Sequence, residues 1–195
     1  MMKKPPFEHS GILLVDKPKD WTSHDVVNFV RKNFNVKKVG HCGTLDPAAT
    51  GLLVMLLGHA TKLSDKLTGS DKEYSGRMIL GVETDSQDMD GNVISKRATD
   101  GLSEKSVRDA FSKYLGEIEQ LPPMFSASKK SGKKLYELAR KGIEVEREAK
   151  KITIHKLEIE KMEIPFVDFK ISCSKGTYVR TICSDIGKDL GCGAA

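Results

Sequence analysis

"KITIHKLEIEKMEIPFVDFKISCSKG", residues 151–176, is the stretch that decides the fold class. Apolar and polar residues alternate along 151–164 and again along 166–176, which is typical of strands that bury one face. Pro165 separates the two runs, so we expect two antiparallel strands joined at that point. A helix over 177–191 is expected to follow directly.

The segments upstream mix strands and helices without the regular alternation of a parallel sheet. Gly116 follows an amphipathic run with Ser103 as its N-cap, so we expect that helix to stop there. We predict strands over 11–18, 52–57 and 72–81, helices over 22–34, 59–67 and 103–116, and an acidic turn-rich loop over 83–92. This order favours an α+β fold, a mixed and largely antiparallel sheet flanked by helices.

Length and composition indicate one globular domain with a single core. The chain has 195 residues, of which 38% are hydrophobic and 30% charged, ordinary values for a folded protein. Its longest apolar run, 52–57, is far shorter than the roughly 18 residues of a membrane span. The opening "MMKKPPFEHS" lacks the apolar stretch of a signal peptide. We therefore expect a cytoplasmic protein without a membrane partner.

The four cysteines, at 42, 173, 183 and 192, show no C-x-x-C pairing and no regular spacing with the histidines. A structural zinc site is therefore not expected, and we predict no metal ligands. The cysteines are better interpreted as reduced, partly buried small hydrophobic residues.

Positive charge is concentrated in one segment. Residues 129–151 contain nine Lys or Arg and four Glu, so this segment accounts for the whole net charge of +5. A basic segment that includes a tyrosine is suited to contacts with a phosphate backbone. The alternative is a solvated helix face with Glu/Lys pairs.

The loop "GHCGTLDPAATG", residues 40–51, encloses a single carboxylate, Asp46. Pro47 favours extended backbone at Asp46, while Gly43 and Gly51 permit turns on either side. Such a loop can present one side chain at a fixed angle for catalysis. It can also be an Asp-Pro turn in which the aspartate only accepts backbone hydrogen bonds.

Other candidate residues are less specific. Cys42 beside His41 could be a thiol nucleophile with its base, but adjacent residues rarely point at each other. Residues 86–91 resemble the start of a calcium loop, yet Arg97 occupies the position that requires a glutamate, which excludes an EF-hand. The acidic loop is therefore either a solvated turn or part of a site wall.

Tyr74, Tyr178 and Arg180 are expected at a strand start and a helix start. A tyrosine ring can stack on a base, and an arginine can hold a carboxylate through two hydrogen bonds. The alternative for each is half-buried packing. Spacing along the chain leaves open whether they approach Asp46.

Five motifs together resemble the bacterial TruB-type tRNA pseudouridine synthases. In chain order they are "GILLVDKPKDWTSHDVV", "GHCGTLDPAATGLL", "KEYSGRMILGVETDSQDMDG", "LPPMFSASKKSGKKLYELARKG" and "SKGTYVRTICSDIGKDLG". The resemblance runs from about Gly11 to the end of the chain. Archaeal and eukaryotic guide-RNA relatives share the aspartate loop but are less similar elsewhere, so no guide RNA is expected.

The resemblance implies the pseudouridine synthase fold and one reaction. Uridine 55 in the T loop of tRNA becomes pseudouridine when the bond from C1′ to N1 breaks and C1′ bonds to C5. It also implies base flipping, no metal or other cofactor, the tRNA T stem-loop as partner, and a monomeric enzyme.

The resemblance also assigns site residues. Asp46 would be the catalytic carboxylate, attacking C6 of the base or C1′ of the sugar, or promoting elimination at the sugar. Arg180 would pair with Asp46 and keep it ionised, and Tyr74 would stack on the target base and help remove the C5 proton. Tyr178 would line the pocket. The remaining substrate contacts implied are His41, which helps hold the RNA loop, and Asp88, on the flipped base.

The basic segment of about 125–151 corresponds to a thumb insertion of the family that closes over the RNA. Its implied RNA contacts are Lys129, Lys130, Lys133 and Lys134. Ser128 stands where family members commonly carry a hydrophobic residue, and we expect this difference to affect only local packing.

The chain ends in "LGCGAA", where the family continues to the end of the catalytic domain and into a small PUA RNA-binding domain. We therefore expect residues 1–195 to be a catalytic domain incomplete at its C-terminus, with the PUA domain absent. An RNA-binding or tRNA-chaperoning module with little or no activity is the alternative function. A hydrolase using Cys42 is the third.

Overall fold

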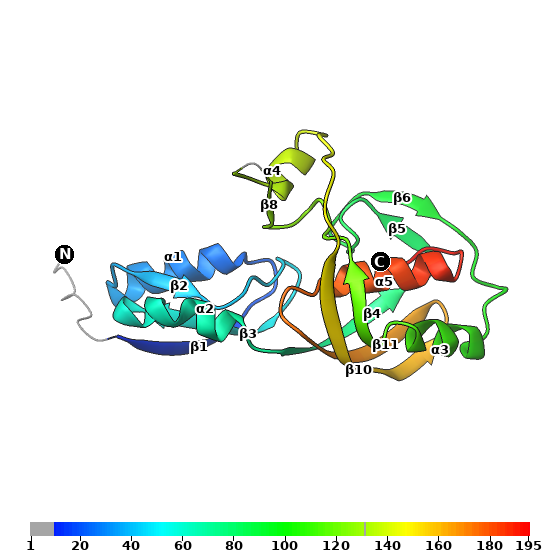
Figure 1. Cartoon of the computed structure of the whole chain (residues 1–195), viewed down its shortest axis with the longest axis horizontal. Helices are drawn as coiled ribbons and strands as arrows, with labels where there is room; N and C mark the ends of the chain where they lie inside the picture. The colour runs from blue at the N-terminus through cyan, green and yellow to red at the C-terminus, as the bar shows by residue number, and fades with distance from the viewer. Residues whose placement is uncertain (1–9, 131) are drawn as a thin grey trace. The chain divides into compact units, whose positions relative to one another are not determined.

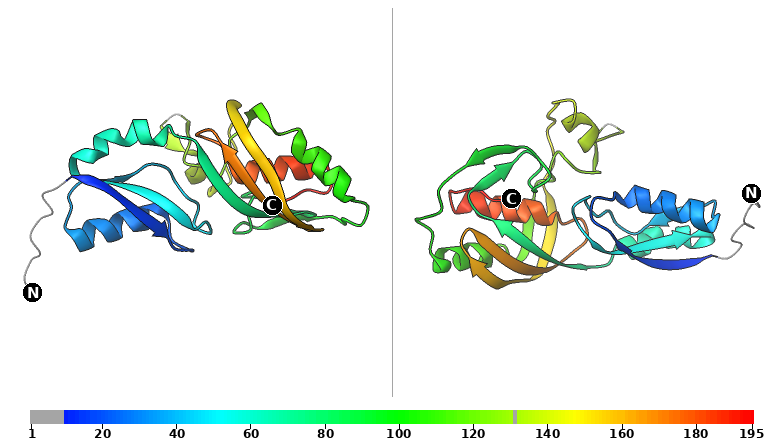
Figure 2. Two further views of the ribbon diagram at one scale, coloured as in Figure 1. Left: turned by 90° about the horizontal axis from the view of Figure 1, so that it is seen from below. Right: turned by 180° about the vertical axis from the view of Figure 1, so that it is seen from behind.

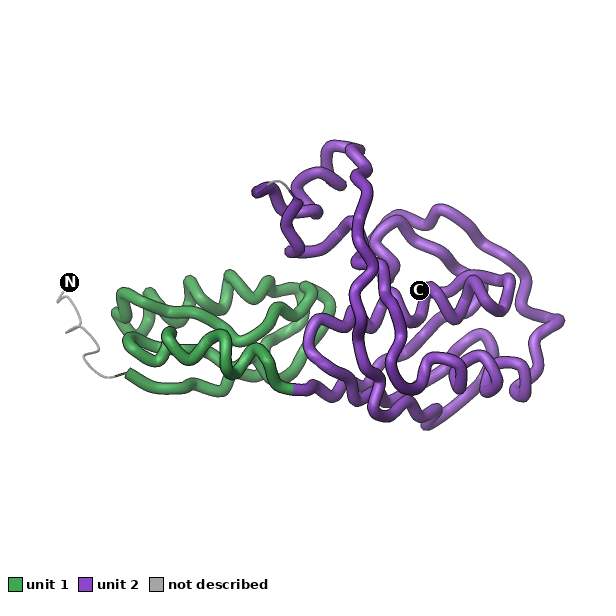
Figure 3. Tube along the Cα trace, in the orientation of Figure 1, with its two compact units in different colours: residues 1–70 green, residues 71–195 purple. Residues whose placement is uncertain are grey.

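The computed structural model describes residues 10–130 and 132–195, and the chain divides into two compact units, Met1–Ser70 and Asp71–Ala195 (Figure 3). Each unit encloses its own hydrophobic cluster, so the expectation of a single core is wrong. The reason is that each unit has its own sheet to cover. The opening residues, on which the expectation of no signal peptide rests, lie outside the described part of the chain, apart from Ser10.

Unit 1 is built on a three-stranded antiparallel sheet with the order β1-β3-β2 (Figure 1). Its elements are β1 (Gly11–Lys17), α1 (Ser23–Phe34), β2 (Val39–His41), β3 (Gly51–Leu57), the 3-10 helix η1 (Gly58–Leu63) and α2 (Ser64–Thr68). Apolar residues of α1 pack on the sheet to form the core: Val26, Val27 and Val30 meet Leu53, Met55 and Leu57.

The predicted helix over 22–34 is confirmed, and its start has a clear physical cause. The Thr22 hydroxyl accepts a hydrogen bond from the Asp25 amide at 3.0 Å, and the Asp25 carboxylate accepts one from the Thr22 amide at 2.8 Å. This capping box satisfies two amides that the helix cannot pair internally. The helix stops at Asn35, which adopts the left-handed conformation with φ of 53°.

The strand expected to be buried on both faces is buried only in part. Leu52, near the start of β3, is 64% exposed, whereas Leu53, Met55, Leu56 and Leu57 are buried. Leu14 on the neighbouring strand β1 is also exposed. Side chains of a strand alternate between faces, and α1 covers one face of this sheet, so the outward-pointing residues at this end stay accessible.

Unit 2 is built on a four-stranded antiparallel sheet with the order β4-β11-β10-β7 (Figure 2). These strands are β4 (Lys72–Ile79), β7 (Gly116–Gln120), β10 (Lys150–Glu163) and β11 (Phe166–Cys173). Helices α3 (Glu104–Ser112) and α5 (Val179–Asp189) pack on the sheet through Val107, Phe111, Ile182 and Ile186. The predicted hairpin across Pro165 and the α+β antiparallel architecture are confirmed.

Strand β7 was not predicted from the sequence. The helix that begins at the predicted cap Ser103 ends at Ser112, and Gly116 adopts a positive φ of 94° and begins the strand. A glycine in this conformation ends a helix and also permits the turn into a strand, so its presence alone does not tell which follows.

Two hairpins project from the sheet of unit 2. One joins β5 (Val82–Thr84) to β6 (Val93–Lys96) around the predicted acidic loop. The other, β8 (Lys129–Lys130) with β9 (Lys133–Lys134), precedes α4 (Leu135–Ala139) in the expected thumb. No described helix has the length and apolar character needed to cross a membrane.

The thumb is expected at about 125–151, and the segment that leaves the sheet overlaps this range with somewhat different bounds. Gln120, the last residue of β7, is the register partner of Lys150, the first residue of β10. The excursion from the sheet is therefore 121–149, and the last two lysines of the basic segment are strand residues. Lys151 forms an ion pair with Glu117 at 3.0 Å on the neighbouring strand.

Candidate active site

The backbone of the loop is held on both sides of Asp46. On one side, the Ser23 hydroxyl accepts a hydrogen bond from the Leu45 amide at 3.0 Å and donates to the Leu45 carbonyl at 3.2 Å. On the other side, the Pro47 carbonyl accepts from the Asp20 amide at 2.9 Å. Asp46 therefore sits on a fixed section of backbone within unit 1, as the Gly/Pro composition of the loop predicted.

Lys17 is the buried support of this loop. The side chain is fully buried, and its ammonium donates to the carbonyls of Trp21 at 2.6 Å, Pro18 at 2.9 Å and Pro47 at 3.1 Å. Three acceptors satisfy the three donors of an ammonium group. Burial lowers the pKa of Lys17, and the carboxylate of Asp46 is among the nearby charges that oppose this shift.

Lys17 was not predicted as a site residue, although the sequence carries a signal for it. Strand β1 alternates, with Leu13 and Val15 packed against the core of unit 1, and Lys17 continues the same period. A lysine at an inward-facing strand position must satisfy its charge locally. Here it does so by collecting carbonyl groups from the turn before α1 and from the loop after Asp46.

The Asp-Pro turn itself is formed. The Ala49 amide donates to the backbone carbonyl of Asp46 at 3.1 Å. Gly43 and Gly51 have φ values of 133° and 110°, which L side chains rarely adopt, so both predicted turn positions require glycine. The two interpretations of the loop, an Asp-Pro turn and a catalytic loop, are therefore compatible. The backbone makes a turn, and the Asp46 carboxylate remains the candidate reactive group.

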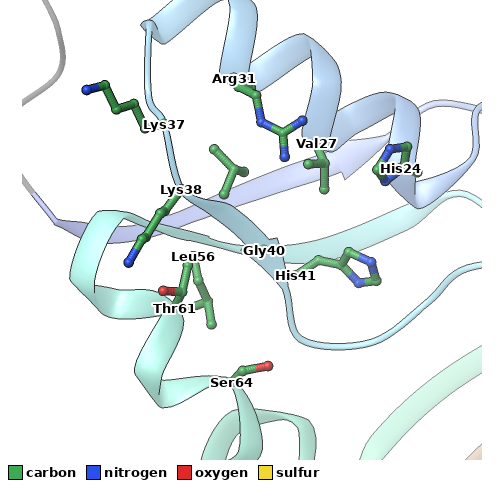
Figure 4. Close-up of a pocket in the computed structure, with 11 residues that line it drawn as sticks. His24, Val27, Arg31, Lys37, Lys38, Gly40, His41, Leu56, Thr61 and Ser64 are labelled. Carbon is green, nitrogen blue, oxygen red and sulfur yellow. The ribbon is translucent and has the colours of Figure 1, made fainter.

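His41, at the end of β2, is oriented by its own loop. Its Nδ1 forms a hydrogen bond with the carbonyl of Gly43, and because a carbonyl only accepts, Nδ1 carries the proton in this bond. The side chain lies beside a groove of about 530 Å³ in unit 1 (Figure 4). The basic residues that line it are His24, Arg31, Lys37, Lys38 and His41, and none of the described lining residues is acidic.

The four cysteines are buried and none of them is in a disulfide bond. Cys42, the candidate thiol nucleophile, is among them, and its amide donates to the Val54 carbonyl of β3 at 2.9 Å. Burial of this kind is typical of packing residues rather than of reactive thiols.

In unit 2, Arg180 connects three segments. It lies in the first turn of α5, and its Nη1 forms an ion pair with Asp88 Oδ2 at 3.1 Å and donates to the Ser86 carbonyl at 3.3 Å. Its Nη2 donates to the Phe125 carbonyl at 2.6 Å. Arg180 thus holds the acidic loop and the base of the thumb against α5.

Asp88 is held from both carboxylate oxygens. Oδ1 accepts from the Ser86 hydroxyl at 2.6 Å and from the Asp90 amide at 3.1 Å, and Oδ2 faces Arg180. The backbone carbonyl of Asp88 also accepts from the Thr84 hydroxyl at 2.6 Å. The acidic segment is therefore an organised hairpin loop rather than a solvated turn.

Tyr178 immediately precedes α5 and is held at both its backbone and its hydroxyl. The side-chain amide of Gln120 exchanges two hydrogen bonds with the Tyr178 peptide groups, and the Tyr178 hydroxyl lies 3.1 Å from the Ser128 hydroxyl. The Arg180 guanidinium lies 5.9 Å from the centre of the Tyr178 ring. Ser128 therefore does more than the local packing expected of it, and Gln120, which was not singled out from the sequence, also holds Tyr178.

Tyr74 lies near the start of β4, with Ile171 of β11 as its register partner. It is partly buried and packs against the hydrophobic cluster of unit 2. The half-buried packing considered for this residue is therefore present, and its ring belongs to the same unit as Tyr178 and Arg180. Asp46 and His41 belong to unit 1.

The thumb concentrates positive charge at its tip. Lys129 lies opposite Lys134 in the β8–β9 hairpin, and Lys130 opposite Lys133. Like charges in directly opposed strand positions repel one another, which destabilises the hairpin. Binding of an anionic partner would offset this repulsion. Tyr136 packs beside it, with Lys134 Nζ 5.3 Å from its ring centre.

Comparison with known proteins agrees with this architecture. A family model described as TruB family pseudouridylate synthase, N-terminal domain, matches residues 31–179. Proteins named tRNA pseudouridine synthase B are 50% identical over 193 residues in Opitutus terrae and 53% identical over 194 residues in Protochlamydia amoebophila. Each match covers 99% of this chain, and it covers 80% and 73% of the respective relative. The chain therefore belongs to the TruB family of pseudouridylate synthases.

Other relatives are longer. The Clostridium tetani protein of the same name is 48% identical over 185 residues, a match that covers 95% of this chain and 64% of the relative. Among solved structures, a Cbf5-Nop10-Gar1 complex matches with a TM-score of 0.71 and 30% identity, covering 94% of this chain and 45% of that one. An H/ACA RNP bound to a substrate RNA containing 2'-deoxyuridine matches with a TM-score of 0.68 and 27% identity, covering 94% and 44%. The expected fold class is confirmed.

Proposed function

We propose that this chain isomerises uridine 55 in the T loop of tRNA to pseudouridine, with Asp46 as the catalytic carboxylate. The observation that carries the proposal is the support of the Asp46 loop, which Ser23 and Lys17 hold on either side of the aspartate. The relatives named tRNA pseudouridine synthase B support tRNA as the substrate.

The reaction needs a carboxylate in a fixed position and no net gain or loss of atoms by the nucleotide. The C1′–N1 bond breaks, the uracil turns, C1′ bonds to C5, and the C5 proton is lost while N1 gains one. Asp46 can serve by adding to C6, by adding to C1′, or by promoting elimination at the sugar. Each route requires the carboxylate and the nucleotide at near-attack distance, which a pinned loop favours.

The neighbouring roles follow from side-chain chemistry. Arg180 pairs with Asp46 and keeps it ionised, since a nearby guanidinium favours the charged form of a carboxylate. Tyr74 stacks on the target base and assists removal of the C5 proton. Tyr178 lines the pocket, Asp88 contacts the flipped base and orients Arg180, and His41 helps to hold the RNA loop.

Two cationic surfaces support RNA binding. The thumb hairpin presents Lys129, Lys130, Lys133 and Lys134, and the groove beside His41 presents further basic side chains. Flipping a base out of its stack costs a few kcal/mol, which such contacts must offset. The protein surface then recognises the T stem-loop without a guide RNA. The enzyme acts as a monomer in the cytoplasm.

The experiment is tritium release from T-loop RNA carrying 5-tritiated uridine, with the parent chain and Asp46→Asn compared side by side. Asparagine keeps the shape of the side chain and removes the carboxylate. Release by the parent and none by the variant, with similar RNA affinity, is the expected result. RNA binding without release by the parent would instead favour the RNA-binding or tRNA-chaperoning module, which the lysine-rich hairpin also suits.

A further inference from the structure

Gln120 is a buried amide at the end of a core strand. It is 2% exposed and ends β7, where the strand alternates between exposed glutamates and inward-facing residues such as Ile118. A buried amide without partners is costly, so its donors and acceptor must be satisfied within the protein. The partner is 58 residues away in the sequence.

Both ends of the Gln120 amide bind the same residue. Oε1 accepts from the Tyr178 amide at 2.8 Å, and Nε2 donates to the Tyr178 carbonyl at 3.1 Å. Two residues in an antiparallel sheet exchange hydrogen bonds in the same way. Gln120 therefore binds Tyr178 with the hydrogen-bond pattern of a neighbouring strand, although Tyr178 does not belong to a strand.

This clamp acts at the point where α5 begins. Tyr178 is the N-cap residue of α5, with extended backbone at φ of −101° and ψ of 103°, and its own side chain makes no capping bond. Its carbonyl also accepts the first helical hydrogen bonds, from the amides of Thr181 at 3.0 Å and Ile182 at 3.2 Å. Gln120 therefore binds the peptide groups from which the first turn of α5 begins.

The first turn carries Arg180, whose guanidinium binds Asp88 and the Phe125 carbonyl. A rotation of the Tyr178 peptide would redirect both the phenol and the guanidinium. We propose that Gln120 is a positioning residue of the active site, which fixes the Tyr178 peptide and thereby aims Tyr178 and Arg180. Its effect on the reaction rests on the proposed function, whereas its effect on α5 does not.

The test compares Gln120→Met, which keeps the length and removes both hydrogen bonds, with Ile152→Val, a control in the same core. Ile152 is buried on β10 and does not contact the Tyr178 backbone through any hydrogen bond. Single-turnover pseudouridine formation by Gln120→Met should fall about 30-fold, because small displacements of reacting groups are costly. Its dissociation constant for RNA should stay within about twofold of the parent, because Gln120 is buried and no rim contact is lost. Ile152→Val should keep the parent rate.

Amide hydrogen exchange gives a readout that does not depend on activity. In Gln120→Met, exchange at Tyr178, Thr181 and Ile182 should accelerate about tenfold or more, while the strands β10 and β11 keep their protection. If Gln120→Met does not fold, Gln120→Asn replaces it, because asparagine is shorter by one methylene and withdraws the amide from Tyr178. The same changes in rate and in hydrogen exchange are expected for this variant.

A double variant separates positioning from simple destabilisation. If Gln120 acts through Arg180, then Gln120→Met should cost much less in an Arg180→Lys background than in the parent, because coupled residues are not additive. Equal costs in both backgrounds, or parent-like exchange at Tyr178, would overturn the proposal. If the parent itself forms no pseudouridine, the proposed function fails, and the exchange measurement alone decides whether Gln120 fixes the start of α5.

Discussion

Arg180 and Asp88, 92 positions apart in the chain, form an ion pair in which Nη1 lies 3.1 Å from Oδ2. Their side chains are 11% and 24% exposed, so solvent screens this pair less than the surface pairs of unit 2. The same guanidinium reaches the carbonyls of Ser86 and Phe125. The position of the candidate catalytic arginine therefore depends on the acidic hairpin and on the base of the thumb.

We predict that Asp88→Asn loosens Arg180. The amide keeps the shape of the side chain but removes the counter-charge, which should lower the free energy of unfolding by about 2 kcal/mol, as for a lost hydrogen bond between charged groups. Turnover of RNA should fall as well. Urea unfolding and single-turnover rates measure the two effects. Asp90→Asn, on an exposed neighbour of the same loop, is the control and should change neither, whereas parent-like behaviour of Asp88→Asn would exclude this role.

Lys17→Met should destabilise the Asp46 loop, because it removes the hydrogen bond that Lys17 donates to the Pro47 carbonyl. Methionine fills a similar volume but removes the Lys17 donor from the carbonyls of Pro18 and Trp21, and it leaves the Pro47 carbonyl with the Asp20 amide alone. We expect a loss of about 2 kcal/mol in the free energy of unfolding and a lower reaction rate of the folded protein. Thermal unfolding and tritium release provide the measurements. Lys19→Met, on the exposed turn, should match the parent; equal stability of both variants would contradict the role given to Lys17.

Ser128→Ala tests the bond between the thumb base and Tyr178. Removal of the hydroxyl leaves the Tyr178 phenol without its partner on Ser128, so we expect a decrease of about two- to tenfold in reaction rate, the value of one ordinary hydrogen bond. In a Tyr178→Phe background the same substitution should have almost no further effect. The rates of the four proteins form a double-mutant cycle. Additive losses would mean that the two hydroxyls act independently.

Reversal of the thumb lysines should weaken RNA binding and its dependence on salt. Each phosphate contact that is lost reduces the slope of log affinity against log salt by about 0.7 to 0.9, so four reversals can reduce it by about 3. Fluorescence anisotropy over a range of salt concentrations measures this slope. The variant changes Lys129, Lys130, Lys133 and Lys134 to Glu. Its control reverses Lys156 and Lys161, exposed lysines of β10, and an unchanged slope in the thumb variant would refute the contact.

Local patterns predicted most of the elements correctly. Alternation predicted the β10–β11 hairpin, and the helix over 22–34 was also predicted, because patterns of this kind depend on neighbours in the sequence. The division into two hydrophobic clusters was not predictable in this way, since composition reports how much apolar surface exists but not how many sheets share it.

The residues that were missed share one property. Lys17 and Gln120 are polar residues at inward-facing strand positions, and each binds backbone groups of a segment distant in the sequence. Asp46 could be singled out because glycine and proline mark its loop locally. A hydrogen bond to a remote carbonyl has no such local sequence pattern. The roles of Lys17 and Gln120 could therefore be identified only from the folded structure.

The pairing of Gln120 with Lys150 has a consequence for how this fold can change over time. Residues 121–149 leave the sheet and return to it at adjacent positions on neighbouring strands, so a tight turn could join β7 to β10 without altering any other strand. Phe125 and Ser128, near the start of this segment, contact Arg180 and Tyr178, so they are tied to α5. The part of the segment beyond Ser128 can therefore vary in length or sequence more freely than its base, while the sheet keeps its pairing.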